Sequence, residues 1–251
     1  MISTMKTIGL IGGMSWESSA QYYRLINRVV KERLGGHANA RSLMLTVNFA
    51  EIEALQRKQD WQRMASIMTT AACQLQSGGA ECIILCTNTM HKVAEAIQSA
   101  VSIPFLHIAD ETARAMKQQG VSAPALLGTR FTMEDGFYQD RLRVSGVLQT
   151  KIPNPRDREF VHRAIYEELC QGVLNEETRA EFRRIIARLV RDGADGLILG
   201  CTELGLLVQA EDATVPVFDT TEIHARAAAD YALEILLGDS RSEWLTNTEP
   251  S

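Results

Sequence analysis

The segment "SGGAECIILCTNT" at residues 77–89 recurs in the second half of the chain as "RDGADGLILGCTE" at residues 191–203. The two segments align without a gap, and Gly79-Ala80 corresponds to Gly193-Ala194. Each passes from a glycine turn into a short apolar run, which is typical of a buried strand in a parallel sheet. We therefore predict two homologous α/β lobes related by a pseudo-twofold axis. The alternative is that helix-to-strand connections of α/β proteins resemble one another in general.

The flanking sequence supports the repeat. "LIGGMS" at 10–15 resembles "LLGTRFT" at 126–132, and "SIPFLHIAD" resembles "TVPVFDTTE". Short apolar runs alternate with amphipathic stretches, which predicts mostly parallel sheets. The expected strands are 7–11, 42–47, 82–85, 104–108, 125–127, 196–199 and 215–218, and the expected helices are 15–33, 60–76, 91–100, 133–142, 158–169, 175–191 and 221–237.

These elements predict an N-terminal lobe over 1–120, a second lobe over 121–237 and a polar tail over 238–251. The C-terminal helix could cross over to the first lobe. The active site is expected in the cleft between the lobes.

The composition is that of a globular protein, with 251 residues, 45% hydrophobic and 23% charged. A net charge of −5 and the absence of a Lys/Arg cluster argue against nucleic-acid or anionic-membrane partners. No apolar run approaches the ~20 residues that span a bilayer. Residues 1–6 lack the apolar core of a signal peptide, so we expect a cytoplasmic protein.

Five cysteines occur, at positions 73, 82, 86, 170 and 201. They show neither C-x-x-C spacing nor an adjacent pair of histidines, which argues against a disulfide framework and against a zinc site. We expect free thiols and no bound metal.

Four segments end predicted strands with small or polar residues: 12–15, 87–89, 128–130 and 201–203. Ligands of open α/β sheets bind outside the carboxyl ends of the strands. Two facing lobes would bring these segments to one cleft. A small molecule there would meet Thr87 on one side and Cys201 on the other.

The repeat aligns Thr87 with Cys201 and Cys86 with Gly200. Because side chains alternate along a strand, Cys86 should face the packing if Thr87 faces the cleft. Cys201 precedes a predicted helix N-terminus, which would lower the pKa of its thiol.

Other residues support weaker predictions. The glycines of "IGLIGG" do not have the G-x-G-x-x-G spacing, so a nicotinamide or flavin site is not supported, although the N–H groups after them could hold a carboxylate. We expect packing or hydrogen-bonding roles for the histidines at 91, 107 and 224. Loop residues Gln56, Arg57 and Arg130 are candidates for binding a carboxylate, or they are solvated surface.

Five motifs in order resemble the aspartate/glutamate racemases, which do not use pyridoxal phosphate: "IGLIGGMSWESS", "CTNTMH", "LLGTRFTME", "LILGCTELGLL" and "VFDTTEIHA". The resemblance covers about residues 7–237. It implies a two-lobed fold, a homodimer, no cofactor, and two cysteines that act on opposite faces of the substrate α-carbon. "GCTE" with Glu203 is similar to the aspartate racemase form, which implies L-aspartate or L-glutamate as substrate.

The resemblance also implies roles for single residues. Met14 and Gln56 would contact the substrate, as would the loops Thr87-Asn88-Thr89 and Cys201-Thr202-Glu203. A lysine that often meets the substrate side-chain carboxylate is replaced by Gln171.

The first catalytic cysteine of the family corresponds to Thr87, whose hydroxyl hardly ionises near neutral pH. We therefore expect Cys201 to remove the α-proton of the L-amino acid and Thr87 to reprotonate from the other face. The reaction that starts from the D-enantiomer should be much slower.

Three other functions stay open at this point. A related cysteine-dependent isomerase or decarboxylase of a dicarboxylate or hydantoin would use the same fold. A non-catalytic amino-acid binding protein could have lost its first cysteine. A cysteine hydrolase would require a histidine beside Cys201, and His224 is the available candidate.

Overall fold

The computed structural model describes residues 5–147 and 149–237, which form two parallel three-stranded sheets. The first sheet has the order β2-β1-β3, and the second has the order β4-β5-β6. All four strand pairings are parallel. The strands are β1 Ile8–Gly12, β2 Ser42–Thr46, β3 Cys82–Leu85, β4 Ala125–Gly128, β5 Leu197–Gly200 and β6 Val217–Asp219.

The two sheets repeat each other strand for strand. Phe105, which lies outside the named strands, makes an isolated parallel bridge to Ile83 of β3. Lys151, also outside the named strands, makes an isolated parallel bridge to Ala125 of β4. With these bridges, β1 corresponds to β4, β3 to β5, and the segment at Phe105 to β6. This correspondence agrees with the sequence repeat and confirms the predicted fold class.

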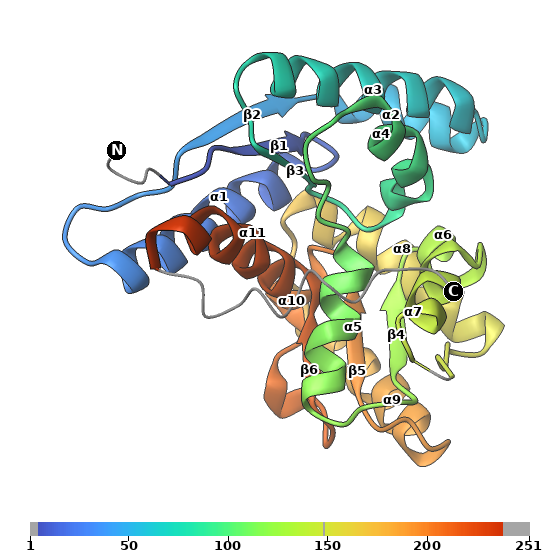
Figure 1. The fold of residues 1–251 in the computed structure, drawn as a ribbon. Helices are drawn as coiled ribbons and strands as arrows, with labels where there is room; N and C mark the ends of the chain where they lie inside the picture. Colours follow the sequence, from blue (N-terminus) through green and yellow to red (C-terminus); the bar gives the residue numbers. More distant parts are fainter. Residues whose placement is uncertain (1–4, 148, 238–251) are drawn as a thin grey trace.

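Helices cover both faces of the first sheet (Figure 1). On one face, α1 (Trp16–Leu34) and α11 (Thr220–Leu237) lie side by side and pack on β1 and β3. On the other face lie α2 (Phe49–Arg57), α3 (Trp61–Ser77), the 3-10 helix η1 (Thr89–Val93) and α4 (Ala94–Ala100). Strands buried on both faces explain why β1 and β3 are apolar without alternation.

The second sheet forms its own core with the remaining helices. They are α5 Ile108–Gln118, α6 Arg130–Glu134, α7 Phe137–Val144, α8 Pro155–Glu167, η2 Leu169–Gln171, α9 Glu176–Arg191, α10 Leu204–Leu207 and η3 Ala210–Asp212. The buried residues of α5 belong to this core, whereas those of α11 belong to the core around β1. The last helix of the chain therefore returns to the first lobe, and α5 also packs against α11.

Three local predictions are wrong. The predicted strand 104–108 is reduced to the bridge at Phe105, and helix α5 begins at Ile108. The side chain of His107 accepts a hydrogen bond from Ala109 N and so caps α5, a role that the apolar pattern does not reveal. The predicted helix 133–142 is two helices, because Gly136 adopts a φ of 78° between α6 and α7. Helix α2, where a loop was expected, carries Gln56 and Arg57.

None of the helices within residues 5–147 and 149–237 is long and apolar enough to cross a membrane. The same residues contain no cluster of three or more His, Cys, Asp or Glu side chains that could hold a metal ion. The predicted polar tail at 238–251 lies outside the described residues.

Candidate active site

The carboxyl ends of β1, β3, β4 and β5 converge on one small cavity between the two lobes. The cavity is about 30 Å³ in volume, which is roughly the space of one water molecule. Its lining contains the residues predicted as catalytic or substrate-binding from the family resemblance: Met14, Gln56, Thr87, Asn88, Thr89, Cys201, Thr202 and Glu203. Thr129, from the predicted cleft segment 128–130, also lines it, and the remaining lining residues are Phe49, Ile165, Tyr166, Cys170 and Gly200.

The loop after β1 is shaped by Gly13. Its φ is 91°, and a Cβ there would lie 2.1 Å from the carbonyl oxygen of Val47, so no other residue fits. The backbone N–H of Gly13 donates to Ser19 Oγ on α1. Ser15 caps the same helix by accepting from Ser18 N. This turn places Met14, which is 7% exposed, at the edge of the cavity.

Thr87 follows β3 and is half-buried, whereas its neighbour Cys86 is fully buried between the first sheet and α11. The prediction that Cys86 faces the packing is therefore confirmed. Burial raises the pKa of the Cys86 thiol far above its ordinary value. Among the described residues, no hydrogen bond joins the Thr87 hydroxyl to a basic side chain.

His91 fixes the backbone of the Thr87 loop. Its Nε2 accepts from Ile108 N at 3.2 Å, so Nδ1 carries the proton and donates to the carbonyl oxygen of Thr87 at 2.7 Å. Burial lowers the pKa of His91 well below its ordinary value, which keeps the ring neutral. The predicted hydrogen-bonding role of His91 is confirmed.

Asn88 carries an unpaired buried oxygen at the cavity. The Thr220 hydroxyl donates to the Leu199 carbonyl, so it can only accept from Asn88, which fixes Nδ2 toward Thr220 at 3.0 Å. Asn88 Oδ1 is then left without a hydrogen-bond partner among the described residues. A buried acceptor of this kind needs a donor, and a ligand in the cavity could supply it.

On the opposite side, Glu203 accepts hydrogen bonds from its own loop and from the other lobe. Cys201 Sγ lies 3.0 Å from Glu203 Oε2, and Thr202 Oγ1 lies 2.7 Å from the same oxygen. The Ser18 hydroxyl, on α1, lies 2.7 Å from Glu203 Oε1 and 2.5 Å from Thr202 Oγ1. Ser18 belongs to the "WESS" motif and was not expected in the site.

The prediction of a lowered pKa for Cys201 is wrong. Burial, followed by the negative charge of Glu203, raises the pKa of this thiol well above its ordinary value. Helix α10 after it has only four residues, so its dipole offers little compensation. In this closed state Cys201 is a protonated thiol that donates to Glu203.

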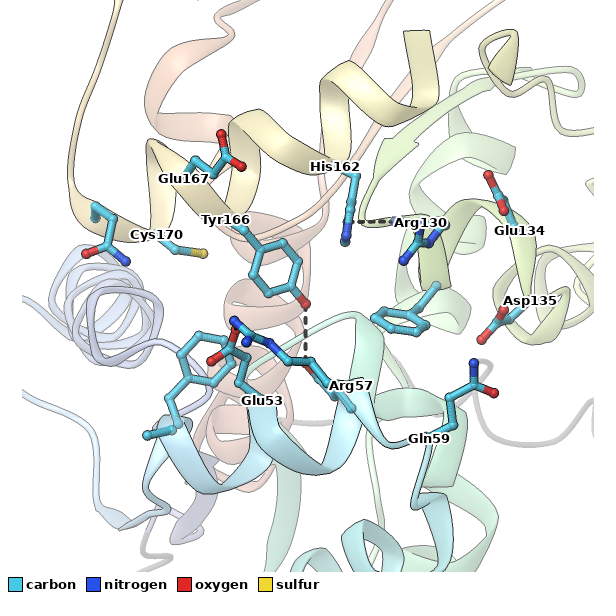
Figure 2. Close-up of a pocket in the computed structure, with 15 residues that line it drawn as sticks. Glu53, Arg57, Gln59, Arg130, Glu134, Asp135, His162, Tyr166, Glu167 and Cys170 are labelled. Carbon is cyan, nitrogen blue, oxygen red and sulfur yellow. Dashed lines mark hydrogen bonds and ion pairs between the residues drawn. The ribbon is translucent and has the colours of Figure 1, made fainter. Parts of the chain in front are cut away.

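A second pocket of about 760 Å³ lies directly outside the cavity and shares with it Phe49, Gln56, Tyr166 and Cys170. Figure 2 shows the Tyr166 hydroxyl pointing from α8 toward α2, where it donates to Gln56 Oε1 at 3.2 Å. Gln56 is 4% exposed, and among the described residues its Nε2 has the sulfur of Met90 as its single partner, at 3.6 Å. This pair closes the cavity toward the outer pocket and links the two lobes.

Arg57 and Arg130 line the outer pocket and not the inner cavity. Arg57 pairs with Glu53, and Arg130 lies 3.8 Å from Glu159. Both guanidinium groups are at least half exposed. The alternative prediction for these residues, solvated surface, fits their exposure.

His224 does not contact Cys201. Its Nδ1 bonds the Tyr22 hydroxyl and its Nε2 bonds the Leu106 carbonyl, which confirms the predicted packing and hydrogen-bonding role. The inner cavity has no histidine in its described lining. A cysteine hydrolase with a Cys-His pair is therefore not supported.

Comparisons with known proteins agree with this architecture. The model of the family described as "Asp/Glu/Hydantoin racemase" matches residues 11–228. The broad specificity amino-acid racemase RacX of Bacillus subtilis is 26% identical over 224 residues, which are 88% of this chain and 95% of that protein.

Solved structures give closer matches. A crystal structure of a candidate Asp/Glu racemase from Yersinia pestis is 55% identical, with a TM-score of 0.86, and covers 91% of this chain and 100% of that one. An aspartate racemase homologue from Pyrococcus horikoshii is 35% identical, with a TM-score of 0.80, and covers 91% and 99% of the two chains.

Proposed function

The chain belongs to the Asp/Glu/Hydantoin racemase family, and on that premise we propose that it is a cofactor-independent amino-acid racemase that uses Thr87 and Cys201 on opposite faces of the substrate. The observation that carries the proposal is that these two side chains line one cavity from opposite lobes, at corresponding positions of the internal repeat. Inversion at a carbon needs a proton removed from one face and one returned to the other.

The cavity supplies partners for the common part of an amino acid. Asn88 Oδ1, buried and unpaired, accepts a hydrogen bond from the α-ammonium group. The loops at 87–89 and 201–203 offer backbone N–H groups and hydroxyls to the α-carboxylate. The Thr89 and Thr129 hydroxyls lie 2.9 Å apart at this cavity and can turn toward the same carboxylate.

Glu203 completes the base on the Cys201 side. A thiol that donates to a carboxylate can pass its proton to that carboxylate and become the thiolate. The thiolate then takes the α-proton of the L-amino acid, so that the new S–H bond replaces the C–H bond and the electron pair stays on the α-carbon. Ser18 and Thr202 hold the Glu203 carboxylate in position from both lobes.

On the other face, Thr87 gives its hydroxyl proton to the carbanion. Solvent returns a proton to the Thr87 oxygen, and Glu203 releases to solvent the proton that it took from Cys201. Without a hydrogen bond to a basic side chain, Thr87 removes protons poorly. The two enantiomers have equal free energy, so kcat/KM for inversion is the same in both directions, and the expectation that inversion from the D-enantiomer is much slower does not hold. The two enantiomers therefore differ in how fast they exchange the α-proton with solvent without inversion. Cys201 supports this exchange for the L-enantiomer, whereas Thr87 does not support it for the D-enantiomer.

The substrate and the setting are further parts of the proposal. The resemblance of the "GCTE" motif to aspartate racemases makes L-aspartate and L-glutamate the first substrates to test, and the broad specificity of the Bacillus subtilis relative adds other amino acids. A homodimer is proposed from the same resemblance. Size-exclusion chromatography with light scattering measures the oligomeric state.

The test of the function is loss of the α-proton signal of L-amino acids in D2O, followed by NMR with the purified chain. Cys201→Ala should abolish the loss for every substrate, whereas Cys73→Ala, on α3 and away from the cavity, should leave it unchanged. Binding of an amino acid without exchange in the wild type would instead indicate a non-catalytic binding protein. Full activity of Cys201→Ala would exclude the mechanism.

A further inference from the structure

The two side chains proposed to handle protons come from different lobes. Thr87 follows β3 of the first sheet, and Cys201 follows β5 of the second. Inversion of one carbon requires both residues at a fixed separation, whereas proton exchange on the Cys201 face requires that residue alone. A displacement of about 1 Å at a reacting group can lower a rate by about 10²-fold. Contacts that attach the Thr87 segment to the second lobe should therefore control inversion more than exchange.

Three side chains of the segment after Thr87 reach the second lobe or the start of α11. Asn88 and Thr89 do so inside the inner cavity, through contacts of 3.0 Å and 2.9 Å to threonine hydroxyls, where a substrate would compete with them. Lys92 Nζ donates to Asp135 Oδ2 at 2.6 Å, and both residues lie outside the described lining of that cavity. The Lys92–Asp135 ion pair is thus a contact that a bound substrate leaves intact.

Helix α6 meets η1, which directly follows Thr87 and Asn88, near both of its own ends. Thr129 caps the start of α6 and its hydroxyl lies 2.9 Å from that of Thr89. Asp135 is the residue at which α6 ends, and it accepts from Lys92. These two contacts fix η1 against α6, and the second of them is an ion pair.

Aromatic side chains cover the ion pair. Lys92 Nζ lies 4.0 Å from the centroid of the Trp61 ring. Trp61 in turn meets Phe131 of α6 edge to face, with ring centroids 5.6 Å apart. The side chains of Lys92 and Asp135 are 28% and 29% exposed. Water and salt screen a partly buried pair less than a fully exposed one, so this pair can hold η1 in place against the second lobe.

The ion pair is separate from the Tyr166–Gln56 hydrogen bond that closes the inner cavity. Figure 2 shows Asp135 at the right of the outer pocket, away from Tyr166. The 3-10 helix η1, which carries Lys92, also packs against α7 of the second lobe. The cavity can therefore open at Tyr166 while Lys92 and Asp135 remain in contact.

We infer that Lys92 is a positioning residue of the reaction. Through Asp135 it sets the place of Thr87 relative to Cys201, so that proton return at Thr87 depends on the ion pair and proton removal at Cys201 does not. The inference rests on the proposed racemase function and adds to it two residues outside the cavity that holds the substrate.

The experiment measures two rates for one L-amino acid that the enzyme accepts. Early loss of the α-proton in D2O, followed by NMR, reports proton removal at Cys201, and chiral chromatography measures formation of the D-enantiomer. Lys92→Met keeps the aliphatic stem and removes the charge, so it should lower D-enantiomer formation about tenfold relative to L-enantiomer exchange. Lys92→Arg can still pair with Asp135 and should keep the ratio of the two rates within about twofold of the wild type.

A change on the other side of the ion pair tests whether the two residues act together. Asp135→Asn alters an exposed position and should lower the ratio by the same factor as Lys92→Met. Because both changes remove one contact, the ratio in the double variant should fall no further than in either single variant. Lys31→Met, exposed in the last turn of α1, is the matched control and should leave the ratio unchanged.

The outcomes separate the inference from the function on which it rests. A ratio that is unchanged in Lys92→Met and Asp135→Asn, or two effects that multiply in the double variant, overturns the inference and leaves the racemase function standing. D-enantiomer formation and L-enantiomer exchange that fall by the same factor also overturn it, because a purely structural role lowers both. Absence of exchange in the wild type, or exchange that survives in Cys201→Ala, overturns the proposed function itself.

Discussion

Cys201 Sγ donates a hydrogen bond of 3.0 Å to Glu203 Oε2 inside a buried cavity. A thiol in this position is held protonated by burial and by the negative charge next to it. In the proposed mechanism, Cys201 becomes reactive when its proton passes to Glu203. The carboxylate that raises the pKa of the resting thiol would then also be the group that activates it.

Replacement of Glu203 by glutamine separates these two effects. Glu203→Gln keeps the size of the side chain and removes the proton acceptor, so kcat for α-proton exchange should fall by about 10²- to 10⁴-fold. The same change removes the negative charge that raises the pKa of Cys201, so that pKa should fall. The pH dependence of Cys201 alkylation by iodoacetamide, located by mass spectrometry, measures it.

In the wild type, alkylation should rise about tenfold per pH unit above neutrality, because a raised pKa leaves only a small thiolate fraction there. The curve of Glu203→Gln should be displaced to lower pH while its exchange activity is reduced. If Glu203→Gln lowers both the exchange activity and the thiolate fraction of Cys201, the loss of thiolate would explain the loss of activity. That result would show that Glu203 is not a proton acceptor.

Changes at Thr87 test the asymmetry of the site. Thr87→Val keeps the shape and removes the hydroxyl, so formation of the D-enantiomer should stop while the L-enantiomer still exchanges its α-proton at Cys201. Thr87→Cys should restore a thiol on the second face and raise proton exchange of the D-enantiomer. Chiral chromatography combined with NMR in D2O follows both quantities. D-enantiomer formation by Thr87→Val at the wild-type rate would exclude Thr87 as the proton donor.

The closed cavity must open before a substrate can enter, because about 30 Å³ cannot hold an amino acid. The Tyr166–Gln56 hydrogen bond favours the closed state and is worth roughly 0.5–1.5 kcal/mol. Tyr166→Phe should therefore accelerate alkylation of Cys201 by about two- to tenfold. Tyr23→Phe serves as control, since Tyr23 is 53% exposed on α1. Equal alkylation rates in Tyr166→Phe and wild type would mean that entry occurs elsewhere.

Three buried histidines make stability depend on pH. The centroid of the His91 ring lies 4.6 Å from that of His107 and 5.8 Å from that of His224. Burial lowers the pKa of His107 and of His224 to about 4, and lowers that of His91 well below 6.5. The unfolded chain therefore binds more protons below pH 6.5, and the free energy of unfolding should decrease from there toward pH 4, by roughly 3 kcal/mol for His224.

Urea unfolding between pH 7.5 and 4 measures this loss. His224→Gln should be less stable at pH 7.5, because Tyr22 loses its partner, and its stability should depend less on pH. His37→Gln, on the exposed segment after α1, is the control. A wild-type stability that does not change between pH 7 and pH 4.5 would contradict the neutral state of the cluster.

The sequence predicted the parts of the fold that depend on local pattern. Buried parallel strands are continuous apolar runs, and the internal repeat aligns Thr87 with Cys201. It did not predict helix α5, because the cap at His107 depends on a side chain that the apolar pattern ignores. The sequence left open whether the last helix, α11, packs on the first lobe. That placement depends on which lobe buries Ala225 and Ala229.

Residues predicted from the sequence line the inner cavity, but the sequence did not predict the electrostatics there. Ser18 contacts Glu203 and Tyr166 lines the cavity, each from an element far from Cys201 in the chain, and no spacing rule links them to Cys201. The pKa of Cys201 was predicted in the wrong direction because burial outweighs the end of a four-residue helix. The burial and the local charge of Cys201 depend on how the two lobes pack together, which local sequence patterns do not describe.

Solvent exchange at the α-carbon of the two enantiomers tests the central claim most directly. Each enantiomer of an amino acid that the enzyme accepts is incubated separately in D2O, and loss of the α-proton is followed by NMR at early times. With Cys201 as the active base and Thr87 as the poor one, the L-enantiomer should lose its proton much faster than the D-enantiomer. Equal initial rates for the two enantiomers would contradict the unequal roles of Cys201 and Thr87.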